Sequence, residues 1–288
     1  MSYKKPRRVF VVEALPRNAL GKVQKHVLRE QLEMKGGSMN DLTGKVVVVT
    51  GGGRGIGRAI ARMLAGAGAD VALCARSQGE IDAVAKELRG TGRRAMAQPV
   101  DVADWEQVER FAKAVAGELG NVDVLVNNAG GGVERNTPIA QSDPKTWWRA
   151  VEVNLEGTYY VTRAFLEHLN DGAKVVNIGS GMGHEAPRGG NSSYNVAKAG
   201  VWMFTQALAV EVWERGIQVN EVLPGIVANG LDPEAKLAEA RRNGAAPRFA
   251  PSERLKHPDR VAELVLWLAT RGEDGPIGQT FSLARRPL

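Results

Sequence analysis

From residue 45 onward the chain alternates between short apolar runs and longer segments of helical periodicity. The apolar runs are KVVVVT (45–50), DVALCA (70–75), AMAQPV (95–100), VDVLVN (122–127), KVVNIG (174–179), IQVNEV (217–222) and QTFSL (279–283). The helical patterns lie near 56–68, 79–90, 104–118, 144–170, 192–214 and 258–270. Because most runs are apolar at successive positions, both faces of the sheet that they form should be covered. The alternation predicts an α/β fold, a Rossmann-type doubly wound parallel sheet with helices on both faces.

The net charge of +6 lies at the start of the chain. Residues 1–38 contain nine Lys or Arg and three Glu, whereas the rest of the chain carries 29 bases and 29 acids. A basic arm of this kind can bind nucleic acid or anionic lipid, but a solvated tail is the more common role. Since the sequence KGGS (35–38) precedes Met39, we expect a short N-terminal extension over 1–38, a foreign tail or linker, ahead of one domain over 39–288. We expect no nucleic-acid or membrane partner.

Composition argues against several other classes of protein. One cysteine, Cys74, leaves no internal disulfide framework and suits the reducing cytoplasm. The four histidines are scattered, without the spacing of metal ligands, so we expect no metal site. No apolar run approaches the roughly 18 residues of a membrane-spanning helix.

The sequence TGGGRGIG (50–57) follows the first apolar run directly and opens a helical pattern. In a doubly wound sheet, this is where the pyrophosphate of a dinucleotide lies on backbone N–H groups at a helix N-terminus. Gly51, Gly55 and Gly57 would allow the tight turn and the close approach of the phosphates. The spacing is G-x-x-x-G-x-G, and a purely structural glycine turn is the alternative interpretation.

The second apolar run ends in Ala75 and is followed by Arg76 and Ser77, where NAD-binding sheets commonly place an acid for the ribose 2′-hydroxyl. Arg54, inside the glycine turn, adds a second cation at the same predicted pocket. Guanidinium and hydroxyl groups favour a 2′-phosphate, which a carboxylate would repel. The sequence therefore favours NADP over NAD, and two solvated surface arginines are the alternative.

Tyr194 and Lys198 in SSYNVAK (192–198) are four residues apart, so they share one face of a predicted helix. The reference pKa of a phenol is near 10, and a nearby ammonium favours the phenolate and lowers that pKa. The two residues are therefore a candidate general acid/base pair. NIGSG (177–181) places Ser180 at the carboxyl end of a predicted strand, the usual place for ligands in such sheets.

Seven short motifs occur together along the chain: TGGGRGIG (50–57), DV (101–102), NNAG (127–130), VNL (153–155), IGS (178–180), YNVAK (194–198) and LPG (223–225). With these motifs, residues of about 41–283 resemble the short-chain dehydrogenases/reductases of the classical type. The resemblance implies an NADP(H)-dependent oxidoreductase that moves hydride between the nicotinamide and a carbonyl carbon. It also implies a homo-oligomer, a tetramer or a dimer.

The resemblance implies a catalytic set of four residues. Tyr194 would donate the proton to the substrate carbonyl, and Lys198 would tune it and hold the nicotinamide ribose. Ser180 would orient the carbonyl, and Asn154 would support a water that relays protons to Lys198. The glycine turn and the motifs together give these candidate cofactor contacts: Gly51, Gly53, Arg54, Gly55, Ile56, Gly57, Arg76, Ser77, Asp101, Val102, Asn127, Ala129, Gly130, Tyr194, Lys198, Pro224, Gly225 and Val227.

The sequence departs from the family pattern at three places. Ser180 and Tyr194 are 14 residues apart, about one more than is frequent in the family. Asn229 stands where the family usually has a Thr that contacts the carboxamide, and an amide can still donate and accept hydrogen bonds. The chain ends in SLARRPL instead of the common Asp-Gly-Gly, which puts subunit contacts at the C-terminus in doubt.

A second resemblance covers residues of about 13–30. LPRNALGKVQKHVLR (15–29) is similar to the C-terminal motif of adenylate-forming acyl-CoA synthetases, malonyl-CoA synthetase being the nearest. In that family the lysine after glycine, here Lys22, contacts the acyl-adenylate. Since the large nucleotide domain of those enzymes is missing, we expect a foreign tail, from a gene fusion or an upstream start codon, with Met39 as the natural first residue.

For the substrate, a 3-oxoacyl thioester is the leading expectation, and a small ketone, sugar, polyol or steroid is the alternative. Residues 225–258 are expected to form a substrate lid, whose cations Arg241, Arg242, Arg248, Arg254 and Lys256 either meet a CoA phosphate or remain solvated. A non-catalytic NADP-binding regulator is the alternative from another class.

Overall fold

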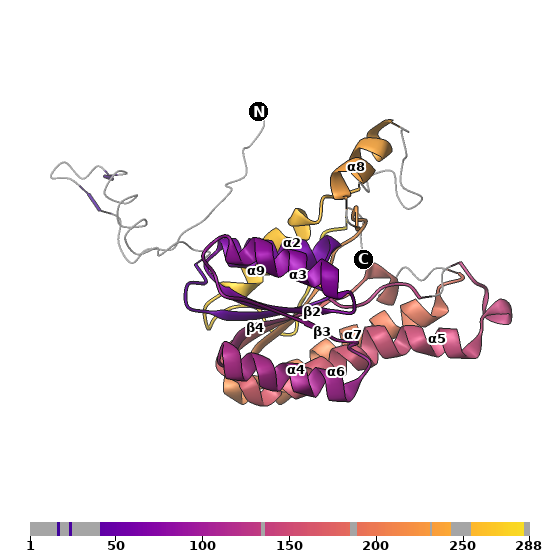
Figure 1. Ribbon diagram of the computed structural model, residues 1–288, viewed down its shortest axis with the longest axis horizontal. Coiled ribbons are helices and arrows are strands. Elements are labelled where there is room, and N and C mark those ends of the chain that lie inside the picture. The colour runs from indigo at the N-terminus through magenta and orange to yellow at the C-terminus, as the bar shows by residue number, and fades with distance from the viewer. Residues whose placement is uncertain are drawn as a thin grey trace. The chain divides into compact units, whose positions relative to one another are not determined.

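The computed structural model describes residues 16–17, 23–24, 41–133, 136–184, 189–230, 232–242 and 255–284 (Figure 1). The chain forms two compact units, Met1–Asp41 and Leu42–Leu288. In the first unit, Arg17 and Val23 form an isolated antiparallel bridge. Lys22, residues 35–38 and Met39 lie outside the described residues, so the assignment of 1–38 as a foreign tail stays a prediction.

The second unit is built on one sheet of seven parallel strands in the order β3-β2-β1-β4-β5-β6-β7. The strands are β1 (Val46–Thr50), β2 (Asp70–Ala75), β3 (Ala95–Pro99), β4 (Val122–Asn127), β5 (Leu169–Ile178), β6 (Gln218–Leu223) and β7 (Thr280–Ser282). The strand order reverses between β1 and β4, where such sheets form a crevice at their carboxyl ends. The predicted doubly wound α/β fold is confirmed.

Helices cover both faces of the sheet (Figure 1). The helices α2 (Gly55–Gly66), α3 (Gln78–Arg89) and α9 (Asp259–Ala269) pack on one face, and α4 (Trp105–Glu118), α6 (Gly157–Phe165) and α7 (Ser192–Glu211) pack on the other. Strand β1 shows why the runs are apolar at every position. Val47 and Val49 belong to the first core, whereas Val46 and Val48 belong to the second.

The segment predicted as one helix over 144–170 is divided in the structure. The helix α5 (Pro144–Val151) continues through one π-helical turn, η2 (Glu152–Glu156), into α6 and the 3-10 turn η3 (Leu166–His168). Strand β5 then begins at Leu169, before the predicted start at residue 174. The start of α5 is fixed by Asp143, whose carboxylate accepts a hydrogen bond from the Thr146 amide at 2.8 Å.

The remaining elements are the 3-10 turns η1 (Ile139–Gln141), η4 (Gly181–Gly183) and η5 (Trp213–Arg215), and the helix α8 (Pro233–Arg242), which falls inside the predicted lid. In the described part of the chain, no helix has both the length and the apolar character needed to span a bilayer. Within the same ranges, no three His, Cys, Asp or Glu side chains gather where a metal ion could bind. Cys74 is buried, and burial raises the pKa of its thiol to about 12, so it is a core residue and not a nucleophile.

Candidate active site

Two adjoining cavities lie at the carboxyl ends of the strands. The larger, about 520 Å³, is lined by segments that follow β1, β2, β3 and β4. The smaller, about 240 Å³, is lined by segments that follow β4, β5 and β6 and by the start of α7. Both cavities are lined by Ile56, Asn128, Gly130, Gly131 and Asn229, so together they form one groove. All the candidate residues line this groove except Gly55, Asn127 and Asn154.

The glycine turn forms one wall of the larger cavity. Gly51 and Gly55 have φ values of +66° and +54°, in the region that favours glycine. A Cβ atom on Gly57 would lie 2.1 Å from the Gly51 carbonyl oxygen. Side chains at these positions would therefore prevent the turn from closing.

Thr50 and Asn128 join this turn to the segment that follows β4, and the sequence analysis did not select either residue. The Asn128 side-chain amide donates to the carbonyl oxygens of Thr50 at 2.9 Å and Gly51 at 3.2 Å. In return, the Thr50 hydroxyl oxygen accepts from the backbone N–H groups of Asn128 and Ala129, each at 3.0 Å. The position of Asn128 inside NNAG was the available signal.

The outer end of the larger cavity carries the cations that the sequence singled out. Arg54, Arg76 and Ser77 all line it, and Ala75 occupies the position where an acid would contact a ribose. One acid, Glu80 in the first turn of α3, also lines this region and was missed. Its carboxylate lies 3.5 Å from the Arg54 guanidinium, whose side chain is 61% exposed. The cationic end therefore contains an internal counter-charge.

Asp101 lines the cavity after β3, together with Val102. Its carboxylate forms an ion pair with Arg149 of α5, a further lining residue that the sequence analysis missed. Arg149 also donates to the Glu152 carboxylate at 3.1 Å, and these two acids hold the pKa of its guanidinium above the ordinary value. The ion pair fixes the cavity wall formed by Asp101.

The structure places Asn127 away from the groove, whereas Ala129 and Gly130 line it. The Asn127 side chain is directed into the core, where its amide donates to Thr162 Oγ1 and Asn177 Oδ1, each at 2.9 Å. Asn127 is the last residue of β4, and its side chain lies on the face that α6 covers, because its partner Thr162 belongs to α6.

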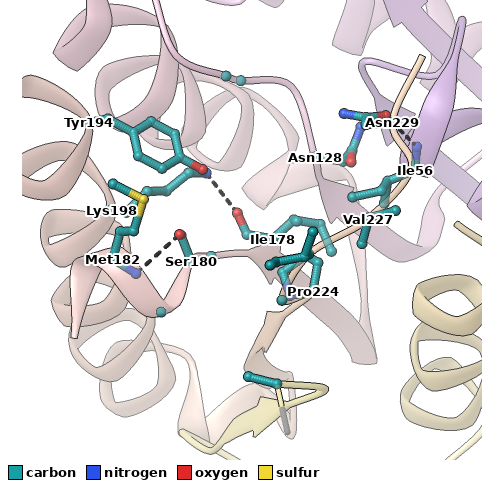
Figure 2. Close-up of a pocket in the computed structure, with 17 residues that line it drawn as sticks. Ile56, Asn128, Ile178, Ser180, Met182, Tyr194, Lys198, Pro224, Val227 and Asn229 are labelled. Atoms are coloured by element: carbon teal, nitrogen blue, oxygen red, sulfur yellow. Dashed lines mark hydrogen bonds between the residues drawn. The ribbon is translucent and has the colours of Figure 1, made fainter. Parts of the chain in front are cut away.

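Ser180, Tyr194 and Lys198 come together in the smaller cavity (Figure 2). Ser180 follows β5, and its hydroxyl oxygen accepts from the Met182 amide at 3.2 Å, which begins the turn η4. Tyr194 and Lys198 lie on successive turns of α7, and the Lys198 ammonium is 5.9 Å from the centre of the Tyr194 ring. The ammonium donates to the Ile178 carbonyl oxygen at 2.7 Å.

Lys198 is buried, with 5% of its surface exposed. Burial disfavours the charged form and lowers the pKa of the ammonium to about 8, while the charge of Glu221 acts in the opposite direction. A proton on Lys198 is therefore exchangeable close to neutral pH, which suits a group that works beside a phenol.

Asn154 lies in the π turn η2 and is fully buried. Its side-chain amide donates to the carbonyl oxygens of Ala150 and Gly131, at 2.8 and 2.9 Å, and its Oδ1 accepts from the Gly131 amide at 2.9 Å. A Cβ on Gly130 would lie 2.5 Å from Asn154 Oδ1 and 3.6 Å from Lys198 Nζ. Asn154 thus stands behind the cavity wall, close to Lys198, and fixes the backbone of 130–131.

The segment after β6 closes the groove. Pro224, Gly225 and Val227 line the smaller cavity, and their contact with a nicotinamide stays a prediction. Asn229 Oδ1 accepts a hydrogen bond from the Ile56 amide at 3.2 Å, at the start of α2 (Figure 2). A Cβ on Gly55 would lie 1.5 Å from that oxygen, so glycine is needed for this contact. The side chains of the lid arginines, residues 241, 242, 248 and 254, lie outside the described residues.

The groove fits a dinucleotide on chemical grounds. The start of α2 lines the larger cavity with Arg54, Ile56 and Gly57, and its first turn contains no acid, so the positive end of the helix dipole lies at the cavity. The glycine turn leaves space for a phosphate, and Arg76 and Ser77 supply a cation and a hydroxyl at the far end. The catalytic candidates line the opposite end of the same groove.

Comparison with known proteins places the chain among its relatives. The family described as short chain dehydrogenase matches residues 45–240. The chain belongs to this family. A 3-oxoacyl-[acyl-carrier-protein] reductase of Synechocystis sp. is 34% identical over 251 residues, which is 85% of this chain and 97% of the relative. A cis-4-hydroxycyclohexanecarboxylate dehydrogenase of Sinomonas cyclohexanicum is 35% identical over 245 residues, 83% of this chain and 94% of the relative.

A solved structure agrees with this assignment. A short chain dehydrogenase from Burkholderia cenocepacia in complex with NADP matches with a TM-score of 0.74 and 33% identity, over 84% of this chain and 97% of that chain. As a member of the short-chain dehydrogenases, the chain is an NAD(P)-dependent oxidoreductase. The family match does not include residues 13–30, so it lends no support to a resemblance with acyl-CoA synthetases.

Proposed function

We propose that this protein reduces a carbonyl group to a secondary alcohol, or catalyses the reverse reaction, with NADP(H) as cofactor. One observation carries the proposal: Ser180, Tyr194 and Lys198 line a cavity that is continuous with the glycine-turn cavity. When bound, the nicotinamide supplies or accepts the hydride. The protein residues then position the carbonyl and move the proton.

Each catalytic role follows from chemistry and placement. The Ser180 hydroxyl lies at the end of β5, where it can donate to the carbonyl oxygen and orient it. The Tyr194 phenol gives its proton to that oxygen, and the Lys198 ammonium stabilises the phenolate that remains. Asn154 holds the backbone beside Lys198, where a water can pass protons to the lysine.

NADP is the proposed cofactor, and its 2′-phosphate would bind Arg54, Arg76 and Ser77. The support is the absence of an acid at the end of β2, where Ala75 stands, together with the two guanidinium groups at the cavity. A fluorescence titration with NADPH and NADH tests this choice. Tighter binding of NADH would refute it.

A 3-oxoacyl thioester is the proposed substrate class, because the Synechocystis relative bears that activity in its name. The alternative is a small alcohol or ketone, which the name of the Sinomonas relative favours. Initial rates of NADPH oxidation with a 3-oxoacyl thioester, a cyclic ketone acid and a ketose separate the two. No oxidation with any carbonyl compound, despite tight NADPH binding, would favour a non-catalytic regulator.

A homo-oligomer, a dimer or tetramer, is the proposed assembly. Three apolar side chains, Val196, Met203 and Val210, follow one another at seven-residue intervals along α7 and are 50%, 55% and 78% exposed. Such spacing keeps them on one side of a helix, where a second copy would cover them. Sedimentation of wild type and of Met203→Glu tests this, and a monomeric wild type would contradict it.

A cytoplasmic location also remains a prediction, based on the single buried thiol.

A further inference from the structure

Strand β6 carries a carboxylic acid in the interior of the protein. Glu221 is 0% exposed and lies among the apolar residues Val219, Val222 and Leu223. A buried carboxylate is costly unless neighbouring groups compensate its charge. The proposed mechanism gives Glu221 no task, so its presence in a central strand requires another explanation.

The surroundings hold Glu221 in one position. Its Oε2 atom accepts from the Thr280 hydroxyl of β7 at 2.9 Å and lies 2.9 Å from His184 Nε2. The His184 ring in turn lies 5.0 Å from the ring of Trp202 on α7. The other carboxylate oxygen of Glu221, Oε1, is buried and has no hydrogen-bond partner among the described residues. A Cβ on Gly179 would lie 1.9 Å from Oε1, so only glycine leaves room for the carboxylate there.

The same short segment holds Lys198. Its ammonium donates to the carbonyl oxygen of Ile178, the residue bonded to Gly179. The Glu221 carboxylate therefore lies against Gly179, and the Lys198 ammonium binds the residue directly before it. Glycine is also required at Gly183, where a Cβ would lie 2.4 Å from the Lys198 carbonyl carbon. The turn η4 thus brings His184 against the same stretch of α7.

We infer that Glu221 is a positioning residue for Lys198: its buried carboxylate, held by Thr280 and His184, supplies the negative charge that keeps the lysine an ammonium inside the protein. The inference rests on the proposed function, because it assigns to that ammonium the stabilisation of the Tyr194 phenolate. Glu221 itself does not line the groove.

The charges around Glu221 are consistent with this role. Among the described residues, two titratable groups act on Glu221: His184, which follows η4, and Lys198 on α7. The neighbouring strands present neutral groups, the Thr280 hydroxyl on β7 and the side-chain amide of Asn177, the register partner of Glu221 on β5. Burial has the largest effect on the Glu221 carboxyl and leaves its pKa raised, while His184, Thr280 and Lys198 act in the opposite direction. Glu221 in turn raises the pKa of Lys198 against the effect of burial.

The test is the pKa of Lys198 in the full-length protein without cofactor. It is measured from the rate of acetylation of this lysine by acetic anhydride at a series of pH values, with mass spectrometry as the readout. Glu221→Gln keeps the size of the side chain and removes its charge, so the Lys198 pKa should fall by about half a pH unit or more. The control is Gln218→Leu, which removes a buried polar group from the same strand and should leave that pKa within about 0.2 pH units.

The second readout is the pH profile of kcat/KM for carbonyl reduction. Because activity needs the ammonium, the high-pH limb should move to lower pH in Glu221→Gln by the same amount. If Glu221→Gln does not fold, Glu221→Leu carries the same expectation, since its side chain has a similar volume and also lacks the charge. A Lys198 pKa equal to or above that of wild type would overturn the inference. Absence of any carbonyl reduction by wild type would instead overturn the proposed function, because acetylation needs no turnover.

Discussion

Replacing Lys198 with Met should make the protein more stable at neutral pH while abolishing its proposed activity. The folded protein lowers the pKa of this ammonium from its ordinary 10.5 to about 8. At about 1.4 kcal/mol for each pH unit, this lowering corresponds to about 3 kcal/mol spent on keeping the buried lysine charged at pH 7. Methionine has a similar length and carries no charge, so this cost disappears.

One loss opposes the gain. The hydrogen bond from Lys198 to the Ile178 carbonyl is removed, and a bond from a charged donor is worth about 1.5–3 kcal/mol. The Ile178 oxygen lies at a cavity wall, where water can replace the lost donor, so we use the lower value. The expected net effect of Lys198→Met is a gain of about 1–2 kcal/mol in the free energy of unfolding at pH 7.

The difference should depend on pH in a defined direction. Below about pH 8 the lysine is charged in both folded and unfolded states, so wild type bears the full cost. Between pH 8 and 10.5 the folded state releases its proton first, the cost falls, and wild type gains on the variant. Urea unfolding at pH 7, 8, 9 and 9.5 measures this trend. Lys113→Met, at a lysine that is 64% exposed, is the control and should shift stability by no more than about 0.5 kcal/mol at every pH. A Lys198→Met protein that is less stable than wild type by a constant amount from pH 7 to 9.5 would refute the reasoning.

Four further outcomes are expected. Tyr194→Phe should lower kcat by about 10²–10⁴-fold and leave the NADPH Kd within about twofold, and a rate above about a tenth of wild type would exclude this phenol as the acid. Ala75→Asp combined with Arg76→Gln should shift the kcat/KM preference toward NADH by about tenfold or more, as expected from the loss of a charge-assisted contact. Asn229→Ala removes the oxygen that accepts from the Ile56 amide, so this amide becomes available to a phosphate and the dinucleotide should bind about 2–10-fold more tightly by calorimetry. Weaker binding would show that the Asn229 amide contacts the cofactor. A chain that starts at Met39 should have a free energy of unfolding within about 1 kcal/mol of the full-length value and a kcat within about twofold of it. Failure of this chain to fold would make residues 1–38 an integral part of the enzyme.

The fold could be predicted because parallel strands with two covered faces leave an unmistakable apolar signal. Boundaries were less accurate where polar residues extend a strand. Strand β5 starts at Leu169, in the polar sequence LNDGA, because its main chain pairs with β4 from Val122 onward. The π turn could not be predicted, since one additional residue barely changes the apolar periodicity of 144–170.

The site was predictable where local motifs fix the chemistry, and less so where neighbours come from distant segments. Ser180, Tyr194 and Lys198 lie together as their motifs indicate. Glu80 and Arg149 face the groove only because of helix placement, which no spacing in the sequence reveals. Glu221 was visible as an acid inside the apolar run IQVNEV, a local conflict that often marks a functional position.

The π turn η2 limits which changes of length the segment 152–156 can tolerate. Side chains bind two carbonyl groups at this turn: the Asn154 amide donates to the Ala150 carbonyl oxygen in α5, and the Thr158 hydroxyl of α6 donates to the Asn154 carbonyl oxygen. An α-helix advances about 100° per residue, so deleting one residue from 152–156 would swing α6 by more than a quarter of a revolution relative to α5. Substitutions here change one contact at a time, whereas an insertion or deletion shifts the register of the whole downstream helix. A transplant of this site onto another scaffold must therefore carry the extra residue with it.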